Sequence, residues 1–129
     1  MTTDLTSAVV QSWLDRYLAA WRSYDPDQIG GLFTEQASYA YHPWDTGELV
    51  LLGRPAIVAN WLEDPDAPGT WSAQYSPLLV SGDRAVTTGI TRYDNGDVFY
   101  NMWVLRFDGD RCADFVEWYM SAPPDPSLD

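Results

Sequence analysis

Residues 98–120 read VFYNMWVLRFDGDRCADFVEWYM, two apolar runs separated by the turn sequence Asp108-Gly109-Asp110. Runs of β-branched and aromatic residues around a glycine-containing turn predict a β-hairpin. The first run carries large apolar side chains on both faces of the expected strand, because Met102 and Trp103 are neighbours. An antiparallel sheet with one wet face would alternate apolar with polar residues. We therefore expect helices to cover one face and a second copy of the chain to cover the other.

Upstream of this hairpin, the sequence predicts two further strands of a meander, an earlier strand and three helices. An N-cap residue or an early proline marks the start of each helix, and turn sequences separate the apolar runs. The predicted helices are 8–23, 25–33 and 53–63, and the predicted strands are 37–42, 71–80, 84–93, 98–107 and 112–120, with 49–52 as a short strand or loop. This order predicts one α+β domain over residues 1–121 and an acidic, proline-rich tail at 122–129.

Composition excludes several classes of function. The 129 residues suffice for one domain, and the 15% aromatic content is typical of a folded chain. The formal charge is −12, so nucleic acids and anionic membranes should be repelled. All seven basic residues are arginines, and without a lysine a Schiff base through that residue is impossible. Cys112 and His42 are each the single residue of their type, which excludes an intrachain disulfide and a Cys/His zinc site. Without a signal peptide or a membrane-spanning run, we expect a soluble, cytoplasmic protein with no metal or cofactor.

Five short motifs, taken in order, carry a resemblance to a known superfamily. They are Arg16–Trp21 followed by Asp25, Leu32-Phe33, Gly53–Ile57, Arg106–Arg111 and Phe115–Trp118. Together they resemble the nuclear transport factor 2-like superfamily, which includes ketosteroid isomerases, SnoaL-like polyketide cyclases, scytalone dehydratase and limonene epoxide hydrolase. The resemblance implies a cone, in which a curved and mostly antiparallel sheet wraps around three N-terminal helices and encloses a pocket. It also implies a homodimer through the outer sheet face, whereas activity varies widely on this fold.

Three residues are candidates for acid–base catalysis. Tyr17 matches the tyrosine with which ketosteroid isomerases stabilise an enolate oxyanion, and it equally fits the apolar face of its helix. His42 ends the first predicted strand, where those isomerases carry their general-base aspartate; a solvated or core histidine is the alternative. Glu117 stands in an apolar strand near the acid/base aspartate of SnoaL-like cyclases, and an ion pair with Arg92 or Arg106 would explain it as well.

Large rings and one strand amide are candidates for the wall of the pocket, although a domain of this size needs most of its rings in the core. The candidate substrate-binding residues are Trp21, Phe33, Tyr39, Trp44, Trp61, Asn101 and Trp103. Trp103 replaces a second, protonated aspartate of the isomerases and can donate only its indole N–H, so the paired oxyanion site is incomplete. Three functions stay open: a cofactor-independent isomerase, dehydratase or cyclase for a hydrophobic small molecule, a non-catalytic domain that binds an apolar ligand, and a dimeric protein-interaction module.

Overall fold

A computed structural model describes residues 5–123, which includes only the first two residues of the predicted tail. The helices are α1 (Ser7–Ser23), α2 (Pro26–Gly30) and α3 (Arg54–Glu63), and the strands are β1 (Phe33–Ala40), β2 (Leu51–Leu52), β3 (Trp71–Ser81), β4 (Arg84–Tyr93), β5 (Val98–Asp108) and β6 (Arg111–Ser121). None of the helices in this part of the chain is long and apolar enough to cross a bilayer.

Helix α1 begins and ends where its local sequence predicts. The side chain of Thr6 accepts a hydrogen bond from the backbone N–H of Val9, which satisfies one free donor of the first turn. At the other end, Tyr24 adopts the left-handed conformation, with φ of 51°, and its N–H returns to the carbonyl of Ala20. The apolar stripe in between is buried, as its three- and four-residue spacing predicts.

The main differences from the predicted elements lie between α2 and β1. Helix α2 ends at Gly30 instead of continuing to about residue 33, because glycine is a poor helix former and two of them follow in sequence. Strand β1 then begins at Phe33, four residues earlier than predicted, and ends at Ala40. His42 therefore lies in the turn after the strand.

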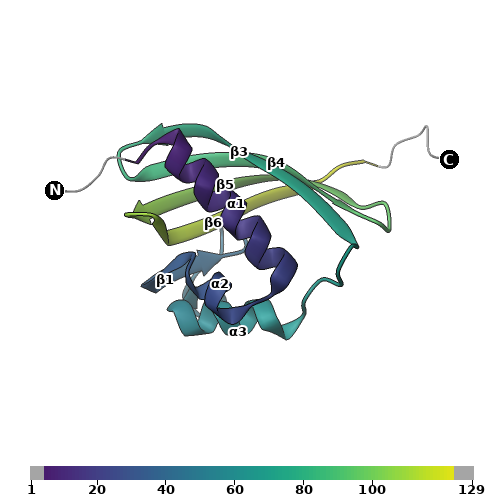
Figure 1. Cartoon of the computed structure of the whole chain (residues 1–129), viewed down its shortest axis with the longest axis horizontal. Coiled ribbons are helices and arrows are strands. Elements are labelled where there is room, and N and C mark those ends of the chain that lie inside the picture. The colour runs from purple at the N-terminus through teal and green to yellow at the C-terminus, as the bar shows by residue number, and fades with distance from the viewer. Residues whose placement is uncertain (1–4, 124–129) are drawn as a thin grey trace.

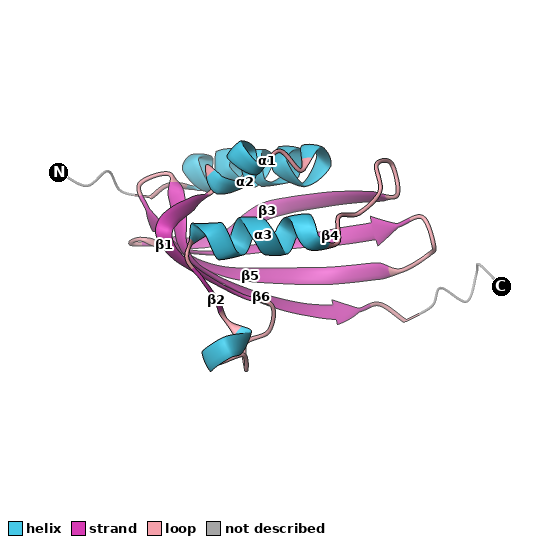
Figure 2. Cartoon of the chain, turned by 90° about the horizontal axis from the view of Figure 1, so that it is seen from below, coloured by secondary structure: helices cyan, strands magenta, loops and turns pink. Residues whose placement is uncertain are grey.

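The six strands form one sheet in the order β2-β1-β6-β5-β4-β3. Only β1 and β6 run parallel, and all other neighbours are antiparallel. The long strands arch over α1, while α2, α3 and β1 lie on the opposite side of that helix (Figure 1). The view from below shows all three helices against the same concave side of the sheet (Figure 2). The α+β class and the curved, mostly antiparallel sheet over three helices are thus confirmed.

Irregular pairing accompanies the curvature. Strand β3 has one extra residue opposite β4, Leu78, and β6 has one extra residue, Ala113, opposite Arg106 and Phe107 of β5. Extra residues of this kind bend a strand and increase its local twist. The sheet can therefore wrap around α1 and leave a concave face.

The core fills the part of the concave face against which the N-terminal half of α1 packs. The Trp13 ring is fully buried, lies 5.5 Å from the Phe107 ring in an edge-to-face arrangement, and donates its Nε1–H to the Leu32 carbonyl at 2.9 Å. Phe33 and Phe115 are also fully buried. Burial of a side chain of this size contributes about 1.5–3 kcal/mol before opposing terms.

Gly89 allows Tyr75 to lie flat against β4. A Cβ atom at position 89 would be 2.0 Å from Cδ1 of Tyr75 and 2.5 Å from the carbonyl oxygen of Gln74. We expect Gly89→Ala to lower the free energy of unfolding by about 1–3 kcal/mol, because the ring must leave its position. Urea denaturation followed by tryptophan fluorescence measures the change. Ser72→Ala, at an exposed position on β3, is the control, and equal midpoints for the two variants would contradict the close packing.

Candidate functional site

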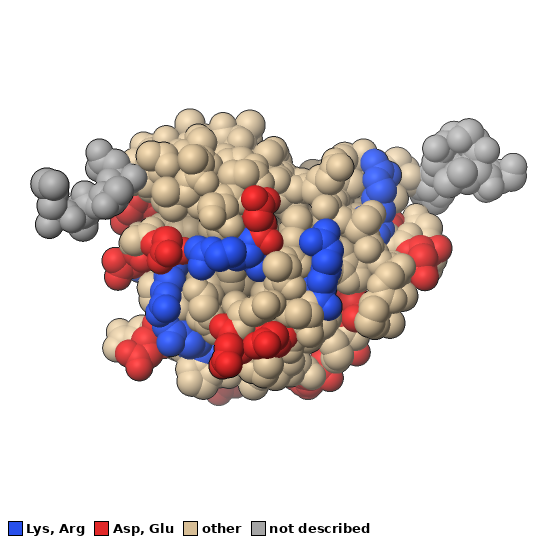
Figure 3. Space-filling model, viewed as in Figure 1, with Lys and Arg blue, Asp and Glu red and all other residues tan. Residues whose placement is uncertain are grey.

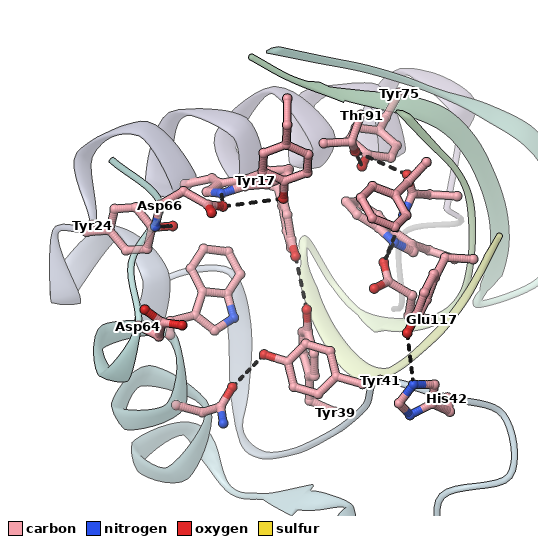
Figure 4. Close-up of a pocket in the computed structure, with 18 residues that line it drawn as sticks. Tyr17, Tyr24, Tyr39, Tyr41, His42, Asp64, Asp66, Tyr75, Thr91 and Glu117 are labelled. Carbon is pink, nitrogen blue, oxygen red and sulfur yellow. Dashed lines mark hydrogen bonds between the residues drawn. The ribbon is translucent and has the colours of Figure 1, made fainter. Parts of the chain in front are cut away.

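A cavity of about 420 Å³ opens at the end of the concave face that the core does not fill. Seven tyrosines, three tryptophans and one phenylalanine contribute to its wall, together with a few polar and charged side chains. They come from the C-terminal half of α1, from β1, from α3 and the segment after it, and from the four long strands. Tyr17, His42 and Glu117, which lie far apart in the sequence, all line this cavity (Figure 4).

The carboxylate of Glu117 is held through one of its two oxygens. Oε2 accepts hydrogen bonds from Nε1 of Trp103 at 2.5 Å and from Nδ2 of Asn101 at 3.3 Å. Trp103 is the direct cross-strand partner of Glu117, so the sheet itself sets this contact. Oε1 has no hydrogen-bond partner within residues 5–123, and Glu117 belongs to the wall of the cavity. One oxygen is thus fixed and the other is available to a ligand.

A chain of donors supports this carboxylate. The Tyr75 hydroxyl bonds Oγ1 of Thr91, and Thr91 donates to Oδ1 of Asn101 at 3.1 Å. Asn101 can then use its amide N–H on Glu117. Because a charged acceptor at the end of such a chain strengthens each bond, the arrangement favours ionised Glu117.

Burial opposes that ionisation. Loss of water around the carboxyl raises the pKa of Glu117 above its ordinary value, while the hydrogen bonds from Trp103 and Asn101 and the nearby His42 lower it. The balance leaves the pKa raised. The predicted alternative of an ion pair is wrong, because Arg106 binds Asp114 at 2.5 Å and Arg92 is exposed.

Two phenols meet at the centre of the cavity. The hydroxyls of Tyr17 and Tyr39 lie 3.0 Å apart, and both side chains are buried. Burial raises the pKa of each well above the ordinary tyrosine value. Both therefore stay protonated at neutral pH, and since one hydroxyl donates to the other, one of the two protons is left for a ligand.

Both ring nitrogens of His42 are already engaged. Nδ1 lies 3.1 Å from Oδ2 of Asp45, and Nε2 lies 3.2 Å from the hydroxyl of Tyr119. A carboxylate can only accept, so the proton of a neutral ring is on Nδ1 and Nε2 accepts from Tyr119. His42 reaches the cavity as one member of this Asp45–His42–Tyr119 group.

Five of the seven predicted wall residues line the cavity, and two do not. Those in the wall are Trp21, Tyr39, Trp61, Asn101 and Trp103. Phe33 is fully buried behind the wall, where its ring meets that of Trp13 edge-on. Trp44 is 72% exposed and stacks on the His42 ring, 4.7 Å away, because the turn after β1 directs it away from the cavity.

Several polar wall residues were not predicted. Thr91 lies on the same face of the sheet as Asn101 and Glu117, and strand alternation extended across three strands could have grouped them. Asp64 and Asp66 follow α3 in a proline-rich segment, for which the sequence predicts only the end of the helix. Such a segment has no periodicity that would predict where its side chains point.

Within the described part of the chain, no group of three or more His, Cys, Asp or Glu residues is arranged to hold a metal ion.

The raised pKa of Glu117 predicts an unusual effect on stability. Between the ordinary pKa of about 4.3 and the raised value, the folded protein keeps a proton that the unfolded chain has lost. The free energy of unfolding of the wild type, relative to Glu117→Gln, should therefore fall as the pH rises through this window and then level off. Urea denaturation of both proteins over a pH series that begins near pH 2 measures the difference.

Asp114 provides a control of opposite sign. Partial burial raises its pKa, but hydrogen bonds from Ser38 and Arg106 outweigh this, so the pKa is lowered. The stability that Asp114 adds relative to Asp114→Asn should be complete above the ordinary aspartate pKa and disappear as the pH falls through the lowered one. A difference for Glu117 that rises with pH, as it should for Asp114, would contradict the desolvated carboxyl.

Comparisons with known proteins agree with this geometry. Residues 14–125 match the family model of the SnoaL-like domain, while no curated protein matches the sequence. An NTF2-like protein of unknown function from Burkholderia xenovorans LB400 superposes with a TM-score of 0.70 at 17% identity, covering 94% of this chain and 90% of the other. A candidate ketosteroid isomerase from Kribbella flavida DSM 17836 gives 0.68 at 15% identity, with 93% and 84% covered.

An LEH-like epoxide hydrolase of M. tuberculosis is more distant, with a TM-score of 0.57 at 12% identity, covering 88% of this chain and 84% of the other. At such identities the likeness shows a shared fold and leaves the activity open. The family model, in contrast, spans most of the sequence. The chain therefore belongs to the SnoaL-like domain family, within the NTF2-like superfamily.

Proposed function

We propose that this protein catalyses a cofactor-independent proton transfer on a hydrophobic small molecule, of the kind used in isomerisation, dehydration or cyclisation. One observation carries the proposal: Glu117 presents an unbonded Oε1 to an aromatic cavity while Oε2 is fixed by Trp103 and Asn101. A base must be oriented and partly desolvated to remove a proton from carbon at an appreciable rate. Glu117 meets both conditions.

Glu117 is the proposed base. Its Oε1 would take a proton from a carbon next to a carbonyl group. The electron pair of that C–H bond would form the C=C bond of an enolate, while the π pair of the carbonyl would move to its oxygen. The protonated carboxyl would then return the proton at another carbon of the same molecule. A raised pKa suits both halves of this cycle, because the group is a stronger base when ionised and still a usable acid when protonated.

The pair of Tyr17 and Tyr39 is the proposed oxyanion donor. One hydroxyl can donate to the ligand oxygen while it accepts from the other, and this strengthens the bond to the developing charge. Trp103 cannot act as a second donor, since its only N–H is bound to Glu117. In place of the second acid of the isomerases, this site thus has a second tyrosine, whose hydroxyl donates to that of the first.

His42 has a supporting role in this proposal. Its Nε2 is occupied by the Tyr119 hydroxyl, so it cannot take a proton from a ligand unless Tyr119 moves. Asp45 orients the ring through Nδ1. We assign His42 and Asp45 to the positioning of Tyr119 at the cavity wall.

A non-catalytic ligand-binding domain is the second candidate. The observation that favours it is the same Trp103 N–H, because its use on Glu117 leaves the cavity with fewer donors than a two-residue oxyanion site has. In that case Glu117 would serve to orient a bound molecule. The experiment on proton exchange separates the two functions.

Deuterium uptake by a simple ketone tests the catalytic proposal. With 2-tetralone in D₂O, NMR should show protein-dependent loss of the signal of the protons next to the carbonyl. We expect Glu117→Gln to lower this rate by roughly 10²–10⁴-fold, as for loss of a general base. Tyr17→Phe should lower it by roughly 10²–10³-fold, as for loss of an oxyanion donor.

Matched controls carry the same substitutions away from the cavity. Glu35→Gln changes an exposed carboxyl on β1, and Tyr100→Phe changes a phenol on the outer face, so both should exchange the ketone at the wild-type rate. If 2-tetralone binds but exchange is equal in wild type and Glu117→Gln, the protein is not a catalyst of this type. The ligand-binding function would then be the better description.

The outer face of the sheet supports a homodimer as part of this proposal. Side chains on this face alternate with the buried ones, and many of them are apolar: Val86, Ile90, Tyr100, Met102, Val104, Val116, Trp118 and Met120. Trp118 and Met120 are 46% and 69% exposed in a single chain. Contiguous exposed apolar surface of this kind is typical of protein interfaces, and a two-fold pair would bury the same patch on both copies.

Trp118→Glu tests the dimer. A charge at the centre of a two-fold contact meets its own copy and loses water, so we expect sedimentation velocity to change from a dimer to a monomer. Leu49→Glu, at a 66% exposed position after β1, is the control and should remain dimeric. A wild-type chain that sediments as a monomer at micromolar concentration would contradict the proposed interface.

We also place the protein in the cytoplasm. Cys112, the single cysteine of the sequence, is a free thiol in the core. A lone buried thiol needs no oxidising compartment.

A further inference from the structure

Apart from His42, which lies near Glu117, the charged groups on the cavity wall have a single sign. Asp64, Asp66 and Glu117 contribute carboxyl groups, and none of the lining residues is an arginine. On the face shown in Figure 3, the arginines lie on the outer surface among acidic side chains. A carboxylate or phosphate ligand would therefore enter the cavity without a cationic partner, at a large cost in desolvation.

Two of the carboxylates gather on one side of the cavity. Figure 4 shows Asp64, Asp66 and Tyr24 across the cavity from Glu117 and His42. Oδ2 of Asp66 accepts from Nε1 of Trp21 at 2.9 Å, which fixes this carboxylate relative to α1. The side chain of Asp64 has no hydrogen-bond partner within the described chain, and it is exposed at the entrance. We call Asp64, Asp66 and the rings beside them the acidic mouth.

Aromatic rings surround these carboxylates. Trp21 and the hydroxyl of Tyr93, which lies 3.5 Å from Oδ2, donate to Asp66, while the hydroxyl of Tyr24 accepts from the Asp66 backbone N–H at 2.8 Å. Trp61 lines the same cavity. The negative faces of such rings attract cations, tryptophan most strongly. Electron-rich rings next to carboxylates form the chemical environment that stabilises a cation of low hydration.

A cation of the protein itself packs on a ring next to this part of the wall, although that ring does not line the cavity. The guanidinium carbon of Arg22 lies 5.6 Å from the centre of the Trp71 ring. Trp71 in turn stacks on Trp21, with the ring centres 3.8 Å apart and the planes 17° from parallel. Trp21 thus connects the acidic mouth, through its bond to Asp66, to the ring that carries Arg22.

We propose that the ligand of this cavity is an apolar molecule that carries a protonated amine or quaternary ammonium group, which the acidic mouth binds while the apolar body extends to Glu117. This inference rests on the proposed function, because it names the ligand class of that same cavity. Asp64 and Asp66 supply the charge, and Trp21, Trp61, Tyr24 and Tyr93 supply the π faces. The mouth also selects against anions of the same shape.

Three naphthalene compounds of equal size test the charge preference. They are 1-naphthylmethylamine, a cation at neutral pH, 1-naphthylmethanol, which is neutral, and 1-naphthoate, an anion. Isothermal titration calorimetry at low ionic strength should give affinities that decrease in the order amine, alcohol, carboxylate. We expect the amine to bind about tenfold more tightly than the alcohol, as one charge contact at a partly exposed site allows. Added salt should reduce this ratio.

Variants locate the contact. Asp66→Asn keeps an oxygen that can accept from Trp21, so it removes the charge without removing that bond, and Asp64→Asn removes the neighbouring charge. We expect each to reduce the preference for the amine and the double variant to abolish it, with the affinity for the alcohol unchanged. Glu35→Gln removes one charge from an exposed position outside the cavity and should preserve the full preference.

Different failures have different meanings. If the alcohol binds and the amine binds no better, the cationic ligand is wrong while the proposed cavity function stands. If the double variant keeps the preference, the assignment to the acidic mouth is wrong. If the preference survives in the double variant but is lost in Glu117→Gln, the cation binds at the deep carboxylate, and the assignment to the mouth is overturned. If none of the three compounds binds, both the cation site and the small-molecule function fail.

Discussion

The hydrogen bond from the indole of Trp103 to the carboxylate of Glu117 is the contact on which the site depends. A carboxylate on the concave face of a sheet loses much of its water, and without a donor it would be neutral or would turn toward solvent. Trp103 provides that donor directly across the strand pair, at 2.5 Å. Because it acts on Oε2 alone, Oε1 is left without a protein partner. The same bond makes Glu117 a structural element of the sheet and a chemically available group.

The cavity exists because α1 fills only part of the concave face. The N-terminal half of this helix buries Val10 and Trp13 completely, so the sheet and helix are in close contact there. The C-terminal half presents Tyr17, Trp21 and Tyr24, which line the cavity. One helix therefore stabilises the core at one end and forms the wall of the site at the other.

Tyrosine serves two purposes in this wall. The rings exclude water and stack, as when Tyr39 lies 4.2 Å from Phe115 and nearly parallel to it. The hydroxyls form short polar chains, Tyr17 to Tyr39 and Tyr75 to Thr91, that end at or near the cavity. Buried hydroxyls need partners, so an aromatic pocket built from tyrosine carries polar groups at defined positions. This combination suits a ligand with a large apolar body and a few charged or polar atoms.

The elements whose residues repeat with a regular period, or lie between clear turn sequences, could be predicted from the order of the amino acids. The 3.6-residue stripe predicted α1, and the apolar runs between turn sequences predicted β3 to β6 within a few residues. The pairing of β5 with β6 then put Asn101, Trp103 and Glu117 on one face. Which rings border empty space could be seen only once the chain was folded, because packing places Phe33 in the core and Trp44 on the surface. The packing of the chain sets which side chains meet. It also decided the partners of His42 and the position of Asp64 and Asp66 at the mouth, because these residues lie in turns without a period. Their direction depends on the curvature of the sheet and on contacts with residues far away in the chain, which local spacing does not encode.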